Sequence, residues 1–569
     1  MIMNKLFHVL TLAIAMVCLL ACDDRSGENQ KSQTQIFVGA EVLIMDSTFS
    51  EAEAFAIAEN KIVAIGSQKE VETKFGGQAT IVDLTGKTVM PAFIDPHVHT
   101  ISAAQNDIFE DVGLTKFDSI EQALNHMIQI GERAKEGDWL LFVNLDFGTQ
   151  PSSYDKLTAE MLDKVSTELP VFVFHAGGHI ASVNSKMIDL MKITKDTPDP
   201  DSGGKFGRKT DGQPDGMLYG FAVMSALEVL DPWNQYDIDQ GIKKASNHWL
   251  STGIGTMGDA GIGNTGDFEE FEKLSNYAKT ESLNVRIRGY LSYSHDKEWD
   301  RRGYQANTGD DKVRIVGYKL SADGSNQART GLQREPYIGT NDYGLAYMSE
   351  DALYKYILDK SSKGFQMAIH GNGDAAIDNI LSALNRAQDD GATLIRPRIE
   401  HCSFVQDDQF EKFKQLGVSG SFLIGHVRLW GTAYKNSVFG LEKSEKLDRT
   451  GSFERAGIPY SLHSDAAVTT FSPLEMVQIA VMRETYAEPG YVLAPQERAS
   501  RKMALRGVTS TAAWQLMSEH EVGSLEVGKL ADFVVLDANP MKVSSNQIDQ
   551  IQVLETWVDG QLKYRKLTD

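Results

Sequence analysis

Two histidines stand one residue apart in the segment MPAFIDPHVHT, at the end of an apolar run. Alternate residues of a strand point to the same side, so His97 and His99 can direct both imidazole rings at one cation. Neutral imidazole is a common ligand of zinc and similar ions in proteins. The pair alone is weak evidence for a metal site, because histidines on strands often make only structural hydrogen bonds.

Further residues of ligand type occur in apolar runs later in the chain, and the joint pattern is harder to dismiss. The runs are VFVFHAGG, GIGTMGDAG, RIVGYKLSADG, FQMAIHGNGD, RIEHCSF and IPYSLHSDAAV, and the ligand-type residues that they carry include Lys319, His370, His401 and Asp465. Two more histidines and a carboxylate would complete a metal site with an open position for water. Asp465 suits two roles, as a metal ligand and as acceptor of the proton of an attacking water.

The alternation of strand-like apolar runs with helical periodicity predicts parallel βα units, and so an α/β fold with a (β/α)8 TIM-like barrel. In such a barrel the carboxyl ends of all strands meet at one mouth, which brings distant residues together. Short alternating segments near both termini predict one small β-sandwich that both termini build. The expected parts are a signal peptide at 1–21, a tether at 22–35, the sandwich at 36–90 and 506–569, and the barrel with insertions at 91–505.

The bulk composition fits a large folded protein and limits its partners. The 569 residues are 42% hydrophobic and 24% charged, which gives enough apolar sequence for a sizeable core. The net charge of −22 argues against nucleic acid and against anionic membrane surfaces as partners. The expected partner is a small-molecule substrate, and the sequence leaves homo-oligomer formation open.

The first residues, MIMNKLFHVLTLAIAMVCLLAC, have the form of a targeting segment, with Lys5 before an apolar run that is short for a membrane span. LLAC resembles the lipobox of bacterial lipoproteins, which favours lipidation at Cys22 over a plain signal peptide or an anchor helix. We therefore expect an extracytoplasmic, periplasm-facing lipoprotein that meets the membrane only through its lipid anchor. Cys402 is then the only other thiol of the mature protein, so no intrachain disulfide is expected.

Together these motifs resemble the amidohydrolase superfamily, and within it the YtcJ-like branch of the amidohydrolase 3 family. MPAFIDPHVHT resembles the metal motif of the first barrel strand, and GYKLSADGSNQART the strand that carries the family lysine. AIHGNGDAAID, RIEHCS and HSDAAV resemble motifs of the fifth, sixth and eighth strands, and HAGGHIASVNSKM a segment typical of the branch. VGSLEVGKLADFVVLD resembles the closing family pattern, so the resemblance covers nearly all of the mature chain.

The resemblance implies a role for each ligand-type residue and one or two divalent metal ions, with zinc the expected metal. His97 and His99 are similar to ligands of the more buried ion, and His370 and His401 to ligands of a second ion. Asp465 is similar to the ligand that also transfers a proton.

Lys319 matches the family lysine that many members carboxylate with CO₂ to bridge two ions. A carbamate offers two negative oxygens, like a bridging glutamate, whereas a protonated lysine beside two cations would be repelled. A protonated lysine that pairs with Asp323, or one that binds an anionic substrate, is the alternative.

Two motifs depart from the family pattern near the expected mouth, and both leave the substrate open. The seventh-strand region SFLIGHVRLWG has Leu423 and Ile424 where the family has Gln-Pro, and it keeps His426. His463 stands where the eighth-strand motif more often has glycine. His179 and His426 are candidate oxyanion donors or substrate ligands, with structural hydrogen bonds as the equally weighted alternative.

Three further side chains are candidates for substrate binding. Arg329 could hold a substrate carboxylate, Trp430 could line an apolar pocket, and His463 lies near the expected mouth. A solvated salt bridge and plain packing are the simpler interpretations of the arginine and the tryptophan. Cys402 follows His401 directly, so strand alternation turns it away from the mouth, where we expect it to pack rather than to act as a nucleophile.

The sequence therefore predicts a metal-dependent hydrolase that activates water to cleave a non-peptide C–N bond, in an N-acyl amino acid or a cyclic amide. An esterase, a lactonase or a mononuclear deaminase would use the same ligand set. The alternative from another class is a non-catalytic binding lipoprotein that kept the barrel. The presence of a suitable residue at every expected ligand position argues against this alternative.

Overall fold

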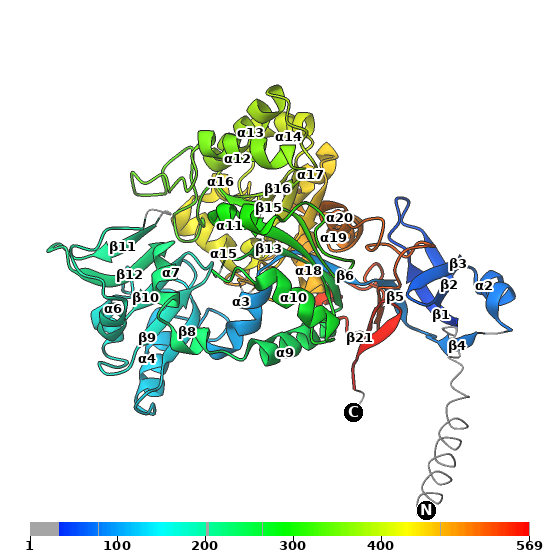
Figure 1. Cartoon of the computed structure of the whole chain (residues 1–569), viewed down its shortest axis with the longest axis horizontal. Coiled ribbons are helices and arrows are strands. Elements are labelled where there is room, and N and C mark those ends of the chain that lie inside the picture. Colours follow the sequence, from blue (N-terminus) through cyan, green and yellow to red (C-terminus); the bar gives the residue numbers. More distant parts are fainter. Residues whose placement is uncertain (1–33, 78, 201–203, 265, 467, 568–569) are drawn as a thin grey trace, which may run out of the picture.

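The computed structural model describes residues 34–77, 79–200, 204–264, 266–466 and 468–567, which form three parts (Figure 1). A mixed sheet from both ends of the chain lies at one side, a barrel in the middle, and an inserted sheet at the other side. The predicted signal peptide, Cys22 and nearly all of the predicted tether lie outside the described residues. Among the helices of the described ranges, none is long and apolar enough to cross a membrane.

The two ends of the chain together build one mixed, eight-stranded sheet. Its strands in spatial order are β22 (Gln561–Arg565), β21 (Val553–Val558), β20 (Phe533–Leu536), β5 (Thr88–Pro91), β1 (Gln35–Leu43), β2 (Glu51–Ala58) and β3 (Lys61–Gly66), with β4 (Thr80–Asp83) beside β1. Antiparallel pairing of β5 with β20 joins the two ends, with Met90 opposite Val534. The prediction that both termini build one β module is confirmed.

This terminal sheet curls around an aromatic cluster. β2 and β20 lie three strands apart, which would separate them by about 14 Å in a flat sheet. The ring centroids of Phe55 in β2 and Phe533 in β20 are nevertheless only 5.0 Å apart. Phe37 stacks on Phe55 at 4.7 Å, and Trp557 stacks on Phe533 at 5.2 Å. Burial of these four rings therefore gives the small module a core of its own.

Eight parallel strands form a nearly closed barrel in the middle of the molecule. Around the barrel they are β6 (Phe93–Val98), β13 (Ile254–Ile262), β14 (Arg286–Ser292), β15 (Val313–Ser321), β16 (Gln366–Gly371), β17 (Arg398–His401), β18 (Ser419–Phe422) and β19 (Tyr460–Leu462). The segment after β19 returns to β6, because the Asp465 amide donates to the His97 carbonyl at 3.1 Å and the His99 amide to the Ala466 carbonyl at 3.2 Å. The predicted barrel is confirmed.

Helices cover the outside of the barrel and bury the apolar side chains on the outer face of its strands. All residues of β16 are buried, and the helix that follows it, α13 (Asp374–Asp389), buries Ile377, Ile380 and Leu384 among others. That spacing of three and four residues is typical of an amphipathic helix on a sheet. Other helices of the barrel region are α9 (Ile238–Ser251), α10 (Glu270–Lys279), α12 (Glu350–Ser362), α14 (Phe410–Leu416), α15 (Gly425–Ala433), α17 (Thr450–Ala456), α18 (Pro473–Met482) and α19 (Arg501–Gly507).

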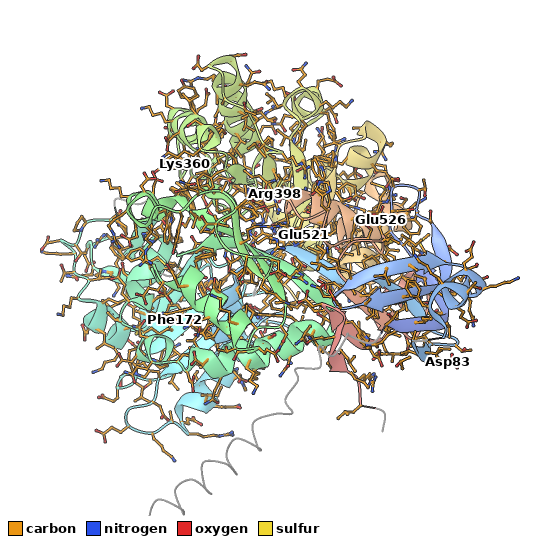
Figure 2. All side chains as sticks on the ribbon, turned by 45° about the vertical axis from the view of Figure 1, so that its right-hand side comes forward. Asp83, Phe172, Lys360, Arg398, Glu521 and Glu526 are labelled. Carbon is orange, nitrogen blue, oxygen red and sulfur yellow. The ribbon has the colours of Figure 1, made fainter. Side chains whose placement is uncertain are left out.

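A separate sheet is inserted between β6 and β13, and the sequence analysis did not predict it. Its strands in spatial order are β11 (Gly204–Arg208), β12 (Pro214–Gly220), β10 (Ile180–Val183), β9 (Val171–His175), β8 (Leu140–Leu145) and β7 (Glu110–Asp111). The expectation that VFVFHAGG belongs to the parallel barrel is wrong, because β9 pairs antiparallel with β10 in this inserted sheet. Figure 2 shows Phe172 in the inserted sheet, Arg398 in the barrel and Asp83 in the terminal module.

Candidate active site

Three of the predicted ligands meet where the first and last barrel strands approach each other. His97 lies in β6, His99 directly follows it, and Asp465 follows β19. Oδ1 of Asp465 lies 3.3 Å from Nε2 of His97 and also 3.3 Å from Nε2 of His99. The His97 side chain is fully buried and the Asp465 side chain is 12% exposed, so Asp465 is the more accessible of the two.

The remaining predicted ligands stand on the next strands around the barrel. His401 ends β17 and His370 lies in β16, and their ring centroids are 4.5 Å apart. Nδ1 of His401 lies 3.8 Å from Oδ2 of Asp465. Nζ of Lys319, in β15, lies 3.1 Å from Nε2 of His97. The fold thus brings the six ligand-type residues together at one cavity: His97, His99, Lys319, His370, His401 and Asp465.

The backbone is strained at two of these residues. His401 has a φ of 64° and Asp465 a φ of 52°, in the left-handed region that residues other than glycine seldom adopt. Such strain costs about 1–3 kcal/mol for each residue and persists where the surrounding structure demands it, often at functional sites. Both residues lie where the chain leaves a barrel strand, and both line the cavity.

Glu400 and Arg398 orient His97, and neither was among the predicted site residues. Nδ1 of His97 donates to Oε2 of Glu400 at 2.5 Å, which leaves Nε2 as the ligand atom. Arg398 donates to both oxygens of Glu400, and all three side chains are fully buried. Burial alone would raise the pKa of Glu400, but Arg398 and His97 hold it well below its usual range. The available signal was a pair of opposite charges inside the apolar run RIEHCSF.

Asp323 orients His370 in the same way. Oδ1 of Asp323 accepts hydrogen bonds from Nδ1 of His370 and from the Asn372 amide, both at 3.0 Å. Oδ2 accepts from the Gly373 amide at 2.8 Å. Asp323 is thereby engaged with His370 and with backbone amides, and not with Lys319 as the alternative interpretation of that lysine required. Burial lowers the pKa of Lys319 to about 8.

The donor set fits a divalent cation. His97, His99 and Asp465 each offer one ligand atom, and these atoms lie within 4.8 Å of one another. Oδ1 of Asp465 and Nδ1 of His401 are buried and have no hydrogen-bond partner among the described residues. Buried polar atoms are nearly always partnered, and a bound ion would satisfy both. Imidazole nitrogen and carboxylate oxygen are ligands that zinc-like ions accept.

The ligand-type residues face a cavity of about 260 Å³ whose walls differ in character. His179 also lines this catalytic cavity, and its Nδ1 lies 3.4 Å from the hydroxyl of Tyr347. An apolar wall comes from the inserted sheet and the segments beside it: Phe109, Phe174, Phe221, Met224 and Leu227. Among the described lining residues there is no arginine, and Lys319 is the only lysine.

A second cavity of about 590 Å³ adjoins the catalytic cavity, and the two share Asn106, Asn144 and Val468 in their walls. Trp430, a predicted substrate-binding residue, lines the second cavity and donates its indole N–H to Asp146. Trp430 therefore lies in the cavity next to the catalytic cavity and not in the wall of the catalytic cavity itself.

The other residues predicted to bind substrate lie outside the wall of the catalytic cavity. Arg329 lines a third cavity and donates to the Ser437 carbonyl at 3.0 Å. His463 is fully buried and stacks on His97, with ring centroids 4.6 Å apart. His426 is 1% exposed and is not among the residues that line the catalytic cavity. The substrate or oxyanion roles of these side chains stay predictions.

The nearly closed barrel and the histidines and aspartate at its mouth define the class of protein, a metal-dependent hydrolase. A family model described as the amidohydrolase family matches residues 80–564, and the chain belongs to this family. The predicted resemblance is confirmed at that level. The lipoprotein assignment rests on residues outside the described ranges and stays a prediction.

Individual relatives agree with the family assignment. The chain is 28% identical over 556 residues to the N-substituted formamide deformylase of Arthrobacter pascens, covering 93% of this chain and 98% of the relative. It is 25% identical over 541 residues to YtcJ of Bacillus subtilis (strain 168), covering 93% and 99%. A solved structure, an uncharacterized metal-dependent hydrolase from Pyrococcus furiosus, matches with a TM-score of 0.69 at 25% identity, covering 90% of this chain and 100% of that chain.

Proposed function

We propose that the protein hydrolyses a non-peptide C–N bond, that of an amide, with water activated by a divalent ion. The observation that carries this proposal is the convergence of four histidines and Asp465 on one cavity, with two buried donor atoms that a cation would satisfy. The Arthrobacter pascens relative, which is named a deformylase of N-substituted formamides, supports a C–N bond as the target.

The six ligand-type residues would hold one or two divalent ions, which we propose to be zinc, and a carboxylated Lys319 would add two negative oxygens to the ligand set. An ion bound there would lower the pKa of a water molecule toward neutrality and polarise the substrate carbonyl. Asp465 accepts the proton of the attacking water and returns it to the leaving nitrogen. His179 donates a hydrogen bond to the oxygen that becomes negative as water adds. Burial lowers the pKa of His179 to about 3, so its ring is neutral at the pH of the reaction.

The walls of the cavities favour a neutral amide with an apolar substituent as substrate. An N-acyl amino acid brings a carboxylate, and the described residues that line the catalytic cavity include no arginine to pair with it. Arg428 lines the adjoining cavity, where its Nε lies 3.6 Å from Oε1 of Glu475. The apolar wall from the inserted sheet suits an aromatic or aliphatic group, and the adjoining cavity gives it room. We therefore place N-substituted amides and cyclic amides ahead of N-acyl amino acids within the proposed C–N class.

The proposal is tested by assaying the purified protein, loaded with Zn²⁺, against a matched panel of substrates. The panel holds an N-benzyl amide, a cyclic amide, an N-acyl amino acid, the ester analogue of the first and an aminopyrimidine. We expect the neutral amides to be hydrolysed, the activity to disappear on removal of metal with a chelator, and Zn²⁺ to restore it. Turnover that survives complete removal of metal would contradict the proposed mechanism.

The same panel separates the rival functions. Faster turnover of the ester would favour an esterase or lactonase, and release of ammonia from the aminopyrimidine would favour a deaminase. Binding of amides without any turnover by the metal-loaded protein would favour a binding lipoprotein that kept the barrel. The filled ligand positions and the partnerless Asp465 oxygen support the enzyme.

We also propose that the protein is an extracytoplasmic lipoprotein that meets a small-molecule substrate and no nucleic acid. The targeting segment and Cys22 support this location. Cells expressing the chain should incorporate labelled palmitate into it, and Cys22→Ser should remove the label and release the protein from the membrane fraction. A wild-type chain without label would contradict the anchor.

A further inference from the structure

His426 belongs to a chain of buried polar side chains that leads to His370. His426 is the second residue of α15 and is 1% exposed. It does not line the catalytic cavity. Its Nδ1 lies 3.3 Å from Oγ of Ser403, which follows β17. Oγ of Ser403 donates to Oδ1 of Asn372 at 2.7 Å. Nδ2 of Asn372 lies 3.3 Å from Nε2 of His370 and donates to the Gly324 carbonyl at 3.0 Å.

The donor and the acceptor of each of these hydrogen bonds can be assigned. Ser403 gives its only hydroxyl proton to Asn372, so its oxygen can act toward His426 only as an acceptor. His426 is therefore the donor through Nδ1–H. The amide of Asn372 is oriented by the Gly324 carbonyl, which can only accept and therefore faces Nδ2, so that Oδ1 faces Ser403. His426 is thus linked to a ligand-type residue, His370, through three contacts.

The arrangement selects one tautomer of His370. Asp323 accepts the proton on Nδ1 of His370, and the Asn372 amide nitrogen, a donor, faces Nε2. Both contacts favour the form in which Nε2 carries a lone pair, which is the form that binds a metal. The contact between Asn372 and Nε2 is long, so an ion can take the lone pair while Asn372 keeps its bond to Gly324.

We propose that His426 is a positioning residue that acts through Ser403 and Asn372 to hold His370 ready to bind a divalent ion, and that it is not an oxyanion donor. This inference rests on the proposed function, because it requires that His370 is a metal ligand. It gives a role to the histidine that the seventh-strand motif keeps, although the chain lacks the Gln-Pro pair before it.

The test compares two substitutions of His426 and two of buried serines. His426→Leu removes the donor, whereas His426→Asn keeps an N–H near the position of Nδ1. Ser403→Ala breaks the chain, and Ser419→Ala is its matched control, because Ser419 is also buried and its hydroxyl has no partner among the described residues. Zn²⁺ affinity is measured by competition with a chromophoric chelator. The kcat is measured with the best amide at saturating Zn²⁺. Folding is checked by thermal unfolding of the protein after its metal has been removed with a chelator.

We expect His426→Leu and Ser403→Ala to bind Zn²⁺ about 10–100-fold more weakly, the effect typical of losing an outer-shell partner. Their kcat at saturating Zn²⁺ should stay near the wild-type value, and His426→Asn and Ser419→Ala should bind Zn²⁺ as the wild type does. A kcat that falls on the order of 10²-fold with Zn²⁺ affinity unchanged would instead make His426 an oxyanion donor and overturn the proposal. Equal losses in all four variants, in step with their thermal stability, would also overturn it, as would affinities that do not change.

The failures of the two proposals are distinguishable. A wild-type protein that binds no Zn²⁺ contradicts the proposed function itself. A wild-type protein that binds Zn²⁺ and hydrolyses amides, with variants that bind equally well, contradicts only the positioning role of His426.

Discussion

Asp465→Asn is expected to lower kcat/KM for the best amide on the order of 10³-fold while the protein stays folded. Its Oδ1 lies 3.3 Å from Nε2 of both His97 and His99 and has no hydrogen-bond partner among the described residues. Asparagine keeps the size of the side chain, but it loses the negative charge that binds a cation and the oxygen that accepts a proton. Steady-state kinetics at saturating Zn²⁺, with circular dichroism as a check of folding, measures the effect.

Asp532→Asn is the matched control for this substitution. Asp532 is also buried, but it lies outside the wall of the catalytic cavity and accepts hydrogen bonds from Arg286. Asparagine keeps an oxygen that can accept from Arg286, so the folded variant should retain activity close to that of the wild type. Near-normal turnover in Asp465→Asn would remove Asp465 from the mechanism, whereas equal losses in both variants would point to general damage of the core.

Much of the site was predictable because a barrel converts distant strand ends into neighbours. His97, His370 and His401 each end or follow an apolar run, and the fold rule alone places such residues at one mouth. The partners that orient them were not predictable. Glu400 reaches His97 across 303 positions of sequence, and only the register of the strands decides that contact. The sequence marks such a residue merely as a charge in an apolar strand.

The inserted sheet escaped prediction for a different reason. An apolar run such as VFVFHAGG has the same composition in a barrel strand and in a separate sheet, because both bury it on two faces. Phe172 and Phe174 are in such a strand, and pairing with β10 decides their place. This sheet and its neighbouring segments supply the apolar wall of the catalytic cavity, on which the proposed preference for neutral amides rests.

The position of Cys402 in the interior was predictable from the sequence. The expectation that this thiol packs in the interior is confirmed, since Cys402 is free and fully buried, and burial raises its pKa well above the usual range. It does not line the catalytic cavity, whereas its neighbour His401 does. A buried thiol with a raised pKa, away from the cavity, is a poor nucleophile.

Lys319→Ala is expected to lose nearly all activity and to regain part of it in the presence of formate, acetate or propionate. Lys319 is 5% exposed and lies 3.1 Å from the ligand atom of His97, where a protonated amine would repel a cation. Burial lowers its pKa to about 8, which increases the share of neutral amine that can combine with CO₂. The carbamate would supply two negative oxygens to the ions, and a free carboxylate that enters the space left by alanine can replace them.

Lys319→Met is the control for the rescue experiment, because methionine fills the space left by the lysine and carries no oxygen. Kinetics with increasing concentrations of each carboxylate, and Zn²⁺ content measured in parallel, separate the two variants. We expect saturable recovery in Lys319→Ala, with the smallest acids most effective if space is limiting, and none in Lys319→Met. Folded Lys319→Ala that binds Zn²⁺ and shows no recovery with any acid would contradict the carbamate, and the lysine would then act as a simple amine beside a single ion.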